Sequence, residues 1–362
     1  MSQPRGDGGD GGDDDGLAPL VVYVPFPMLH DVVDADRLAV IHPGIEVLTT
    51  PFEVEHDFRT AREQDPFSVE LREQAPALTG EQRDAFARAE IVFTLDVPMD
   101  LPSLAPSLRW VQCIGSGVGQ YVSARLPEGN IVLTNGAGIA SAPIAEWILA
   151  RTLQIVKRLP QHDAAARERH WELALGGNLA GSTVAIVGLG AIGREVARRF
   201  RGFGVHLLGV RRTWTCGATD PDVDELFGPD AIAEVVGRAD VTVLAAPGSD
   251  ENESLFDAGM LAAMKPGSIF VNVARGTLVD EPALIDALER GHLGAAAIDV
   301  ARAEPLPPDD PLWAAPNLLI SPHSSASVER YAERAFDLFC DNLERYVAGK
   351  PLRNVVDLTS GY

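Results

Sequence analysis

Short apolar runs alternate with longer stretches of helical periodicity along most of the chain. In the first part, five runs rich in β-branched residues predict buried strands at residues 20–24, 46–50, 91–95, 109–113 and 131–134. The spacing of apolar positions over 79–88 predicts a helix between two of these strands. Such alternation is typical of a mostly parallel sheet with helices on its faces, so we expect the α/β fold class.

A second series of the same kind begins near residue 184. Its predicted strands lie at 184–187, 205–210, 241–245, 269–273, 295–300 and 318–320. Helices are predicted at 141–158, 193–203, 257–264, 281–290 and 327–348, the last ending at Gly349, a typical helix stop. The sequence therefore predicts two doubly wound parallel-sheet domains, and ligands commonly bind in the cleft between two such domains.

Composition narrows the choice of partners and location. The 362 residues are 46% hydrophobic, enough for two domains with cores of their own. A formal net charge of -22 argues against nonspecific binding to nucleic acid or to an anionic membrane, and no apolar stretch is suited to span a bilayer. The three cysteines are scattered and lack metal-ligand spacing, so we expect no metal site and a cytoplasmic protein.

Residues 1–16 form a separate segment of glycine and aspartate without an apolar run. Such a segment is not a signal peptide, and it has no side chains whose burial could offset the entropy of ordering. We expect a disordered acidic tail. The run Asp13, Asp14 and Asp15 could also hold a metal ion, although a solvated run of charges is far commoner.

A glycine-rich motif, Gly188-Leu-Gly190-Ala191-Ile192-Gly193, follows the first strand of the second series and opens a helix. The first glycine permits a tight turn, the second lets the backbone approach a pyrophosphate, and the third lets helix and strand pack closely. In this strand–turn–helix context the motif predicts dinucleotide binding. The alternative is a tight turn without a ligand.

The residues after the next predicted strand are those expected to bind the ribose of the cofactor. A carboxylate at this position would bind the 2′-hydroxyl of NAD, but here the sequence reads Arg211-Arg212-Thr213. A guanidinium binds a 2′-phosphate through charge-assisted hydrogen bonds, so we expect a preference for NADP(H), with NAD(H) also possible. The alternative is two solvated arginines that discriminate little between the cofactors.

Three residues near the C-terminal end follow apolar runs in order: Arg275, Glu304 and His323. Each alone has a plain structural explanation, as a strand-end charge, a loop residue and a turn residue. Together, they could bind a carboxylate, hold an imidazole and transfer a proton. Beside a hydride-carrying cofactor, this combination points to interconversion of carbonyl and alcohol groups.

The motifs in their order identify a resemblance. From about residue 20 to the C-terminus, and most densely over 181–326, the chain resembles the D-isomer-specific 2-hydroxyacid dehydrogenase family. The segments that carry the resemblance are the glycine-rich motif, Met264-Lys-Pro-Gly267, Asn272-Val-Ala-Arg-Gly276, Asp299-Val300 with Glu304-Pro305, and Ser321-Pro-His323.

The resemblance implies a role for each member of the trio. Arg275 binds the substrate carboxylate and polarises the C2 oxygen, and His323 exchanges a proton with that oxygen. Glu304 holds the imidazole and favours its protonated form. Asp299 contacts the nicotinamide carboxamide. We also assign four neighbours of these motifs to the cofactor site: Ala246, Pro247, Val273 and Ala274.

A second contact to the substrate is expected from the loop after residue 113. Cys113-Ile-Gly-Ser116-Gly117-Val resembles the family's Gly-Ala-Gly-Val-Asp run, which implies that the backbone N–H groups of Ser116 and Gly117 bind the substrate carboxylate. Gly119 stands where the family usually has an aspartate.

The resemblance also implies an assembly. A Rossmann dinucleotide-binding domain, residues 141–324, is expected to be inserted in a flavodoxin-like substrate domain made of 17–140 and 325–362. The helix over 141–158 is expected to lie at the domain junction and to help form a homodimer. We expect Trp110, Trp147 and Trp171 to pack in cores or between domains.

The expected activity is hydride transfer between NADP(H) and C2 of a small 2-oxo or 2-hydroxy acid. The two arginines and the compact length look most like glyoxylate/hydroxypyruvate reductases. Two other interpretations stay open: a non-enzymatic NADP(H)-sensing or corepressor-like binding protein, and a dehydrogenase for a bulkier 2-oxo acid.

Overall fold

The structure, a computed structural model, describes residues 19–326 and 329–358 of the chain. The predicted acidic tail, residues 1–16, lies outside the described residues. Contacts divide the chain into two compact units. The first comprises the described residues up to Ile114, Val118–Asn135 and Phe336–Leu358, and the second comprises Gly115–Gly117 and Gly136–Ala335.

The first unit is built on a five-stranded sheet of order β2-β1-β3-β4-β5, in which all neighbours are parallel. This is the strand order of flavodoxin-like domains. The strands are β1 (Leu20–Tyr23), β2 (Ile45–Leu48), β3 (Ile91–Thr94), β4 (Trp110–Cys113) and β5 (Val132–Thr134). The helices are α1 (Ala35–Ile41), α2 (His56–Gln64), α3 (Val69–Glu73), α4 (Gly80–Arg88), α5 (Leu101–Leu104) and α12 (Tyr331–Val347), the last from Phe336 onwards.

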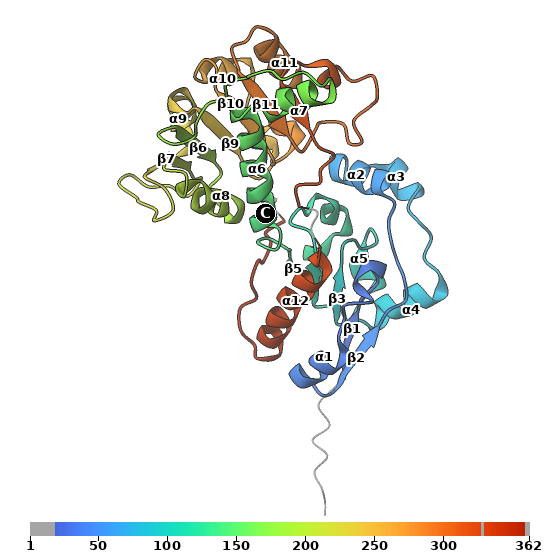
Figure 1. The fold of residues 1–362 in the computed structure, drawn as a ribbon. Coiled ribbons are helices and arrows are strands. Elements are labelled where there is room, and N and C mark those ends of the chain that lie inside the picture. Colours follow the sequence, from blue (N-terminus) through green and yellow to red (C-terminus); the bar gives the residue numbers. More distant parts are fainter. Residues whose placement is uncertain (1–18, 327–328, 359–362) are drawn as a thin grey trace, which may run out of the picture. The chain divides into compact units, whose positions relative to one another are not determined.

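Aromatic side chains fasten helices to both faces of this sheet. On one face Phe339 of α12 stacks on Phe93 and Trp110, with ring centroids 4.5 and 5.4 Å apart. Figure 1 shows α12 lying along the strands. On the other face, Phe86 of α4 meets Tyr23 edge-on at 4.9 Å. Stacked and edge-on pairs add to the burial of apolar area, so these contacts hold the C-terminal helix to the N-terminal sheet.

The second unit is built on a seven-stranded parallel sheet of order β12-β11-β10-β9-β6-β7-β8. The first strand in sequence, β6, lies inside the sheet, so the chain order reverses between β6 and β9, as in a Rossmann domain. The strands are β6 (Thr183–Val187), β7 (His206–Val210), β8 (Glu225–Phe227), β9 (Val241–Leu244), β10 (Ile269–Asn272), β11 (Ala295–Ile298) and β12 (Leu318–Ile320).

Helices cover both faces of the second sheet. The unit's helices are α6 (Ser141–Val156), α7 (Leu159–Arg167), α8 (Ala191–Arg201), α9 (Ile232–Arg238), α10 (Ala258–Ala263) and α11 (Glu281–Glu289). Buried side chains of α6 and α8 share one hydrophobic cluster with the strands, and those of α9, α10 and α11 share another. Burial on both faces explains why these strands are almost wholly apolar in sequence.

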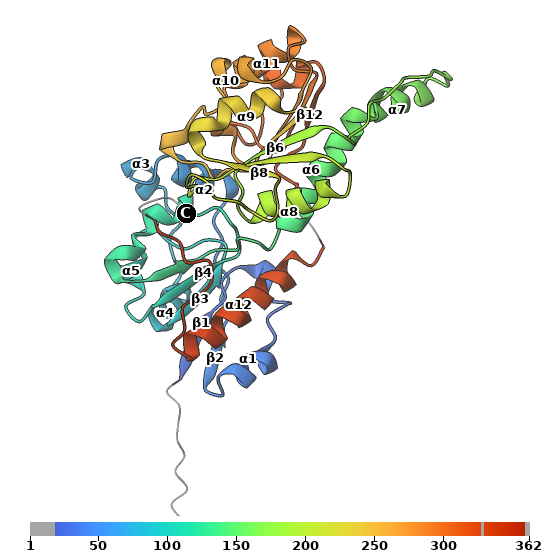
Figure 2. The same cartoon turned by 90° about the vertical axis from the view of Figure 1, so that its left-hand side faces the viewer.

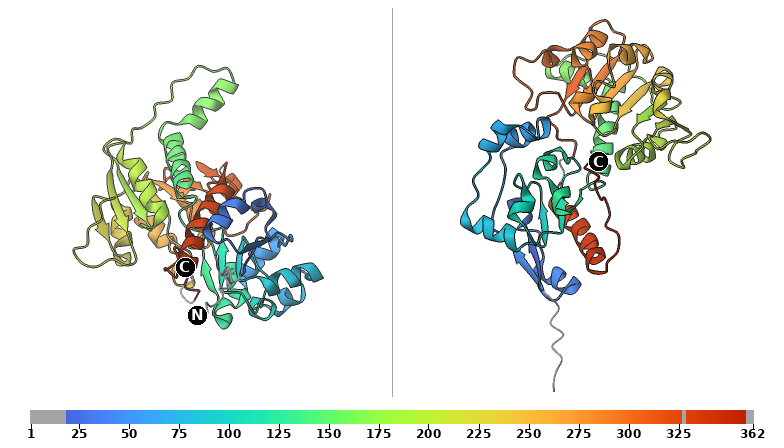
Figure 3. Two further views of the ribbon diagram at one scale, coloured as in Figure 1. Left: turned by 90° about the horizontal axis from the view of Figure 1, so that it is seen from below. Right: turned by 180° about the vertical axis from the view of Figure 1, so that it is seen from behind.

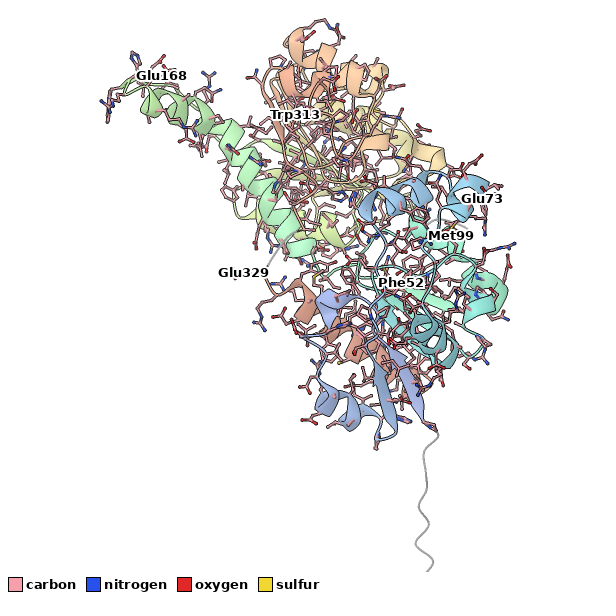
Figure 4. The ribbon with its side chains drawn as sticks, turned by 90° about the vertical axis from the view of Figure 1, so that its right-hand side faces the viewer. Phe52, Glu73, Met99, Glu168, Trp313 and Glu329 are labelled. Carbon is pink, nitrogen blue, oxygen red and sulfur yellow. The ribbon has the colours of Figure 1, made fainter. Side chains whose placement is uncertain are left out.

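Helix α7 departs from this packing. It contains no buried residue and projects away from the sheet of its own unit (Figures 2 and 3), with Glu168 near its far end (Figure 4). The segment that follows exposes large apolar side chains: Trp171 is 103% exposed, Leu173 81% and Leu175 74%. The expectation that Trp171 packs in a core or between domains was therefore wrong for this chain, whereas Trp110 is fully buried.

The predicted α/β fold with two parallel sheets is confirmed. Each predicted strand overlaps an observed one, but the helix predicted over 141–158 ends at Val156, and Arg158 adopts a left-handed conformation before α7 begins. The compact units change over near residues 136 and 336, and the predicted domain bounds at 141 and 325 stay a prediction. The assignment of substrate and cofactor roles to them stays a prediction. No helix among the described residues is long and apolar enough to cross a bilayer.

Candidate active site

The glycine-rich turn has the geometry that its three glycines predict. Gly188 follows β6 with a φ of +105°, and a Cβ there would lie 2.5 Å from the backbone nitrogen of Ala246. A Cβ on Gly193 would lie 2.2 Å from the carbonyl oxygen of Gly188, so α8 packs directly on the turn. Apart from Gly190 itself and its two chain neighbours, no described heavy atom lies within 4 Å of a Cβ added at Gly190. This open space at the N-terminus of an eleven-residue helix fits a pyrophosphate.

Arg211 directly follows β7 and is only partly engaged. Its Nη1 lies 3.5 Å from Asp220 Oδ2, and its Nε is buried with no hydrogen-bond acceptor in the described part of the chain. Arg212 and Thr213, the next residues, are exposed. A buried guanidinium nitrogen without an acceptor fits an incoming phosphate oxygen, because burial without a hydrogen bond is unfavourable.

The imidazole of His323 and the carboxylate of Glu304 form a hydrogen-bonded pair. Nδ1 of His323 lies 2.8 Å from Oε2 of Glu304, and Oε1 of Glu304 accepts a hydrogen bond of 3.1 Å from the backbone N–H of Ala301. Glu304 follows β11 and His323 follows β12, its neighbour in the sheet. The side chain of His323 is 49% exposed, and Nδ1 is the nitrogen that Glu304 holds.

The pair shifts both pKa values toward the charged forms. The hydrogen bond to Glu304 raises the pKa of His323, against burial and the nearby positive charge of Arg275. Burial alone would raise the pKa of Glu304, but the hydrogen bond and the charge of His323 outweigh it and lower that pKa. The arrangement therefore favours imidazolium beside carboxylate.

Arg275 lies at the end of β10, the strand next to β11. The side chain of Asn272 fixes the turn that carries it: Oδ1 accepts from the backbone N–H of Ala274 at 2.9 Å, and Nδ2 donates to the carbonyl of Arg275 at 3.1 Å. A Cβ on Gly117 would lie 2.6 Å from Nη2 of Arg275, within the second unit. The structure thus brings one residue of the predicted substrate loop against the predicted carboxylate-binding arginine.

Asp299 is held by hydrogen bonds within its own unit, and its expected contact with nicotinamide stays a prediction. Its side chain is 1% exposed and accepts three hydrogen bonds, from the Ser321 hydroxyl and from the backbone N–H groups of Ser324 and Ser325. Its carbonyl also accepts from the backbone N–H of His323 at 2.8 Å. His323 has a φ of +49°, and Asp299 holds the backbone on both sides of it.

The first unit explains why Gly119 can replace the family's usual aspartate. A Cβ on Gly119 would lie 2.5 Å from Cγ and 2.9 Å from Oε1 of Glu63, so the carboxylate of Glu63 occupies the space of a side chain at 119. Glu63 lies on α2 beside Arg62, which is 1% exposed and donates to Asp96, Ser123 and two backbone carbonyls. A buried arginine thus anchors the helix that supplies this carboxylate.

Neither a metal-ion cluster nor the cavity found in the first unit involves the predicted site residues in the described part of the chain. No group of three or more His, Cys, Asp or Glu side chains there could hold a metal ion. A cavity of ≈ 380 Å³ in the first unit is lined by apolar side chains, three arginines and Asp100, and its lining includes Phe52 and Met99, which are labelled in Figure 4. The residues predicted for catalysis and cofactor binding do not line this cavity.

The predicted site residues gather at one edge of the second sheet. Gly188, Arg211, Ala246, Arg275 and the Glu304–His323 pair all follow the carboxyl ends of parallel strands. Ligands of open α/β sheets bind at this edge, where the strand order reverses. Val273 and Ala274 are buried in the turn before Arg275, and Pro247 is exposed. Asn272 and Ser321 belong to motifs that carry the resemblance, but no role was predicted for them; their polar side chains are the signal for the hydrogen bonds that they form.

Comparison with known proteins agrees with this geometry. Residues 149–325 match the family model "D-isomer specific 2-hydroxyacid dehydrogenase, NAD binding domain". A glyoxylate reductase of Korarchaeum cryptofilum is 30% identical over 280 residues, which cover 74% of this chain and 82% of that protein. A D-3-phosphoglycerate dehydrogenase of Mycobacterium tuberculosis is 34% identical over 278 residues, or 73% of this chain, and this chain spans only 50% of its length.

Among solved structures, the NADPH-dependent glyoxylate/hydroxypyruvate reductase of Sinorhizobium meliloti, in complex with NADP and sulfate, has a TM-score of 0.72 and 25% identity. The similarity covers 95% of this chain and 99% of that one. The glycine-rich turn, the parallel sheets and these matches lead to one assignment: the chain belongs to the D-isomer specific 2-hydroxyacid dehydrogenase family, as an oxidoreductase that acts on CH–OH groups with NAD(P).

Proposed function

We propose that the protein is an NADP(H)-preferring reductase of small 2-oxo acids, of the glyoxylate/hydroxypyruvate type. The observation that carries the proposal is the pair formed by His323 and Glu304, with Arg275 close enough to affect the pKa of both. A protonated imidazole and a guanidinium at one strand edge can donate a proton to a carbonyl oxygen and bind the adjacent carboxylate.

Each side chain has a definite part in this chemistry. Because Nδ1 of His323 is held by Glu304, Nε2 is the nitrogen that donates the proton to the oxygen on C2, and it accepts the proton in the reverse direction. Arg275 binds the substrate carboxylate together with the backbone N–H groups of Ser116 and Gly117. The bound nicotinamide supplies or accepts the hydride at C2.

Asp299 acts through the loop that it holds. Its carboxylate accepts from both Ser324 and Ser325, and its carbonyl accepts from His323, so it fixes the imidazole's position relative to Glu304. In this proposal a contact to the nicotinamide carboxamide is secondary to that anchoring.

The preference for NADP(H) rests on Arg211, whose buried Nε has no acceptor among the described residues. Arg212 and Thr213 extend the donor set on the exposed side. The S. meliloti reductase, a structural neighbour, carries NADP. A guanidinium fork next to the ribose would bind a 2′-phosphate and has no comparable partner in NAD(H), so NAD(H) is expected to bind more weakly.

We further propose that the chain forms a homodimer in the cytoplasm through α6, α7 and the segment after them. The exposed Trp171, Leu173 and Leu175 support this, because a contiguous set of large apolar side chains is unfavourable in water. No disulfide joins the three cysteines in the described part of the chain, which is in keeping with a reducing compartment. Light scattering after gel filtration should give twice the chain mass, and a monomer at micromolar concentration would exclude the dimer.

A substrate panel tests the proposed activity. Glyoxylate, hydroxypyruvate, pyruvate and phenylpyruvate are each reduced with NADPH and with NADH, and kcat/KM is compared. We expect the highest values for glyoxylate or hydroxypyruvate with NADPH. Equal values with NADH would remove the cofactor preference, a maximum with phenylpyruvate would remove the proposed substrate class, and tight NADPH binding without turnover would favour a sensor.

A further inference from the structure

Arg302 lies two residues before Glu304, and its side chain joins its own loop to two other segments of the second unit, 253–254 and 277–279. Its Nε donates to the carbonyl of Val279 at 3.0 Å, and its Nη2 donates to the carbonyl of Thr277 at 2.9 Å and to the hydroxyl of Ser254 at 2.7 Å. Its Nη1 contacts Glu253 at 3.1 Å. Four of the five guanidinium donors are therefore used, and the planar fork is suited to such divergent acceptors.

Two of these acceptors lie in the segment that directly follows Arg275. Thr277 and Val279 belong to the turn that leads from Arg275 to α11. In the same turn Gly276 packs against the backbone of the Glu304 loop: a Cβ there would lie 2.0 Å from the carbonyl carbon of Ala301. The loop with Arg275 and the loop with Glu304 are thus in direct backbone contact, and Arg302 bonds one to the other.

The backbone of Arg302 adds a further bond between the same loops. Its N–H donates to Oε1 of Glu281, the first residue of α11, at 2.7 Å. One residue earlier, the N–H of Ala301 donates to Oε1 of Glu304. Two successive backbone N–H groups are therefore aimed at two carboxylates, one of which holds His323. Any shift of the segment 301–302 moves the anchor of Glu304.

We propose that Arg302 is a positioning residue that sets the spacing between Arg275 and the Glu304–His323 pair. This inference rests on the proposed function, in which these three side chains act on one substrate. Without the guanidinium, the Gly276 contact and the Glu281 bond remain between the two loops, and the side-chain bonds of Arg302 are lost. Glu304 then holds the imidazole less firmly, and Arg275 is displaced from the substrate carboxylate.

If Arg302 only stabilised the fold, its replacement would lower thermal stability without changing the pKa of His323 or KM. Arg238 provides a matched control for this comparison. Arg238 has a similar exposure, 39% against 33%, and pairs with carboxylates, as Arg302 does with Glu253, but its partners Glu225 and Glu234 lie on β8 and α9. Replacing either arginine removes a partly exposed guanidinium with ion pairs. Only Arg302 connects the two loops that carry the proposed catalytic residues.

The test compares Arg302→Met, Arg302→Lys and Arg238→Met with the wild type. The imidazole of His323 is titrated by NMR, with its signal assigned by its loss in His323→Gln. The charged groups that act on this imidazole are Glu304, Arg275 and Asp299. kcat, KM for the 2-oxo acid and the midpoint of thermal unfolding are measured on the same samples.

In Arg302→Met we expect the pKa of His323 to fall toward its ordinary value and KM for the 2-oxo acid to rise about tenfold, since small displacements of reacting groups strongly lower rates. Arg302→Lys should give smaller changes in the same direction, because a point charge reaches fewer acceptors. Arg238→Met should lose comparable thermal stability without either change.

An unchanged pKa of His323 and an unchanged KM in both Arg302 variants would overturn the proposal, and so would equal changes in Arg238→Met. If Arg302→Met fails to fold, Arg302→Lys is compared with the wild type and with Arg238→Met instead. The imidazole titration needs no turnover. A wild type that reduces no 2-oxo acid would therefore contradict the proposed function, while the NMR comparison would still decide whether Arg302 positions the pair.

Discussion

Two charged clusters at the carboxyl edge of the second sheet use similar chemical groups in opposite ways. Arg194 of α8 binds Asp220 through two hydrogen bonds of 2.9 and 2.7 Å and also contacts Asp222 at 3.0 Å. Asp220 is 4% exposed. Glu304, by contrast, receives one bond from an imidazole that is 49% exposed and one from a backbone N–H.

The difference separates a structural ion pair from a chemically available one. Arg194 and Asp220 satisfy each other with bidentate geometry, so little of either remains for a ligand. The hydrogen bond between Glu304 and His323 uses one imidazole nitrogen and leaves the other for a ligand. Arg211 is intermediate between a fully satisfied ion pair and a pair with an available donor. Its Nη1 lies 3.5 Å from Asp220, and its buried Nε has no acceptor in the described residues. The number of unused hydrogen-bond donors distinguishes a candidate site from a structural ion pair better than the number of charges does.

The largest effect is expected from removing the accessible proton. His323→Gln should lower kcat for 2-oxo acid reduction about a thousandfold, within the usual range for loss of a general acid. NADPH affinity, followed by the change in nicotinamide fluorescence, should stay near that of the wild type. Turnover within a few-fold of the wild type would remove His323 from proton transfer.

The next effect concerns substrate binding by Arg275. Arg275→Ala should lower kcat/KM about a hundredfold, with a higher KM and a lower kcat, because the contact strengthens as negative charge develops on the oxygen. Arg275→Lys keeps the charge without the fork and should recover part of the loss. Steady-state kinetics at saturating NADPH measure both. A change in KM alone would confine Arg275 to ground-state binding.

The pH dependence should respond to Glu304. Its carboxylate raises the pKa of His323, so the imidazolium needed for reduction persists to higher pH, and the reductive rate falls as pH rises through that pKa. Glu304→Gln removes the charge and should move this fall to lower pH, with a loss of about tenfold to a hundredfold above neutrality. An unshifted profile of kcat/KM against pH would show that Glu304 does not set the pKa.

The smallest effect tests the contrast between Arg211 and Arg194. Arg211→Met should raise KM for NADPH about fivefold to tenfold and leave KM for NADH nearly unchanged, since one charge-assisted bond to a phosphate is lost. Arg194→Met is the control and should lower the thermal midpoint while keeping the preference for NADPH. If Arg194→Met changes the cofactor preference more than Arg211→Met, the interpretation of the two clusters is reversed.

Much of the fold could be predicted because most buried strands are continuous apolar runs. Several helices were missed, among them α9, although it buries Ile232, Val235 and Val236 at helical spacing. Two others, α2 and α7, lack an apolar stripe. In α2 the buried side chain is Arg62, so the pattern of apolar positions carries no helical signal. In α7 no side chain is buried at all. Both helices depend on contacts or partners that are distant in sequence, which local periodicity cannot reveal.

The candidate site likewise contains residues that the sequence pattern could identify and residues that it could not. Residues in short motifs at strand ends, such as Gly188 and His323, could be identified because their chemistry needs particular residue types at particular places. The anchoring parts of Asp299 and Arg302 could not, because each depends on hydrogen bonds to segments about 25 residues away. The space at Gly119 is likewise filled by Glu63, from an earlier helix.

The pH dependence of the wild type in both directions is the most direct test of the central claim. kcat/KM is measured for glyoxylate reduction with NADPH and for glycolate oxidation with NADP. Proton donation and acceptance by His323 predict that the first falls and the second rises through one shared pKa, above the ordinary value of imidazole. Rates that do not change in opposite directions with pH would contradict the account.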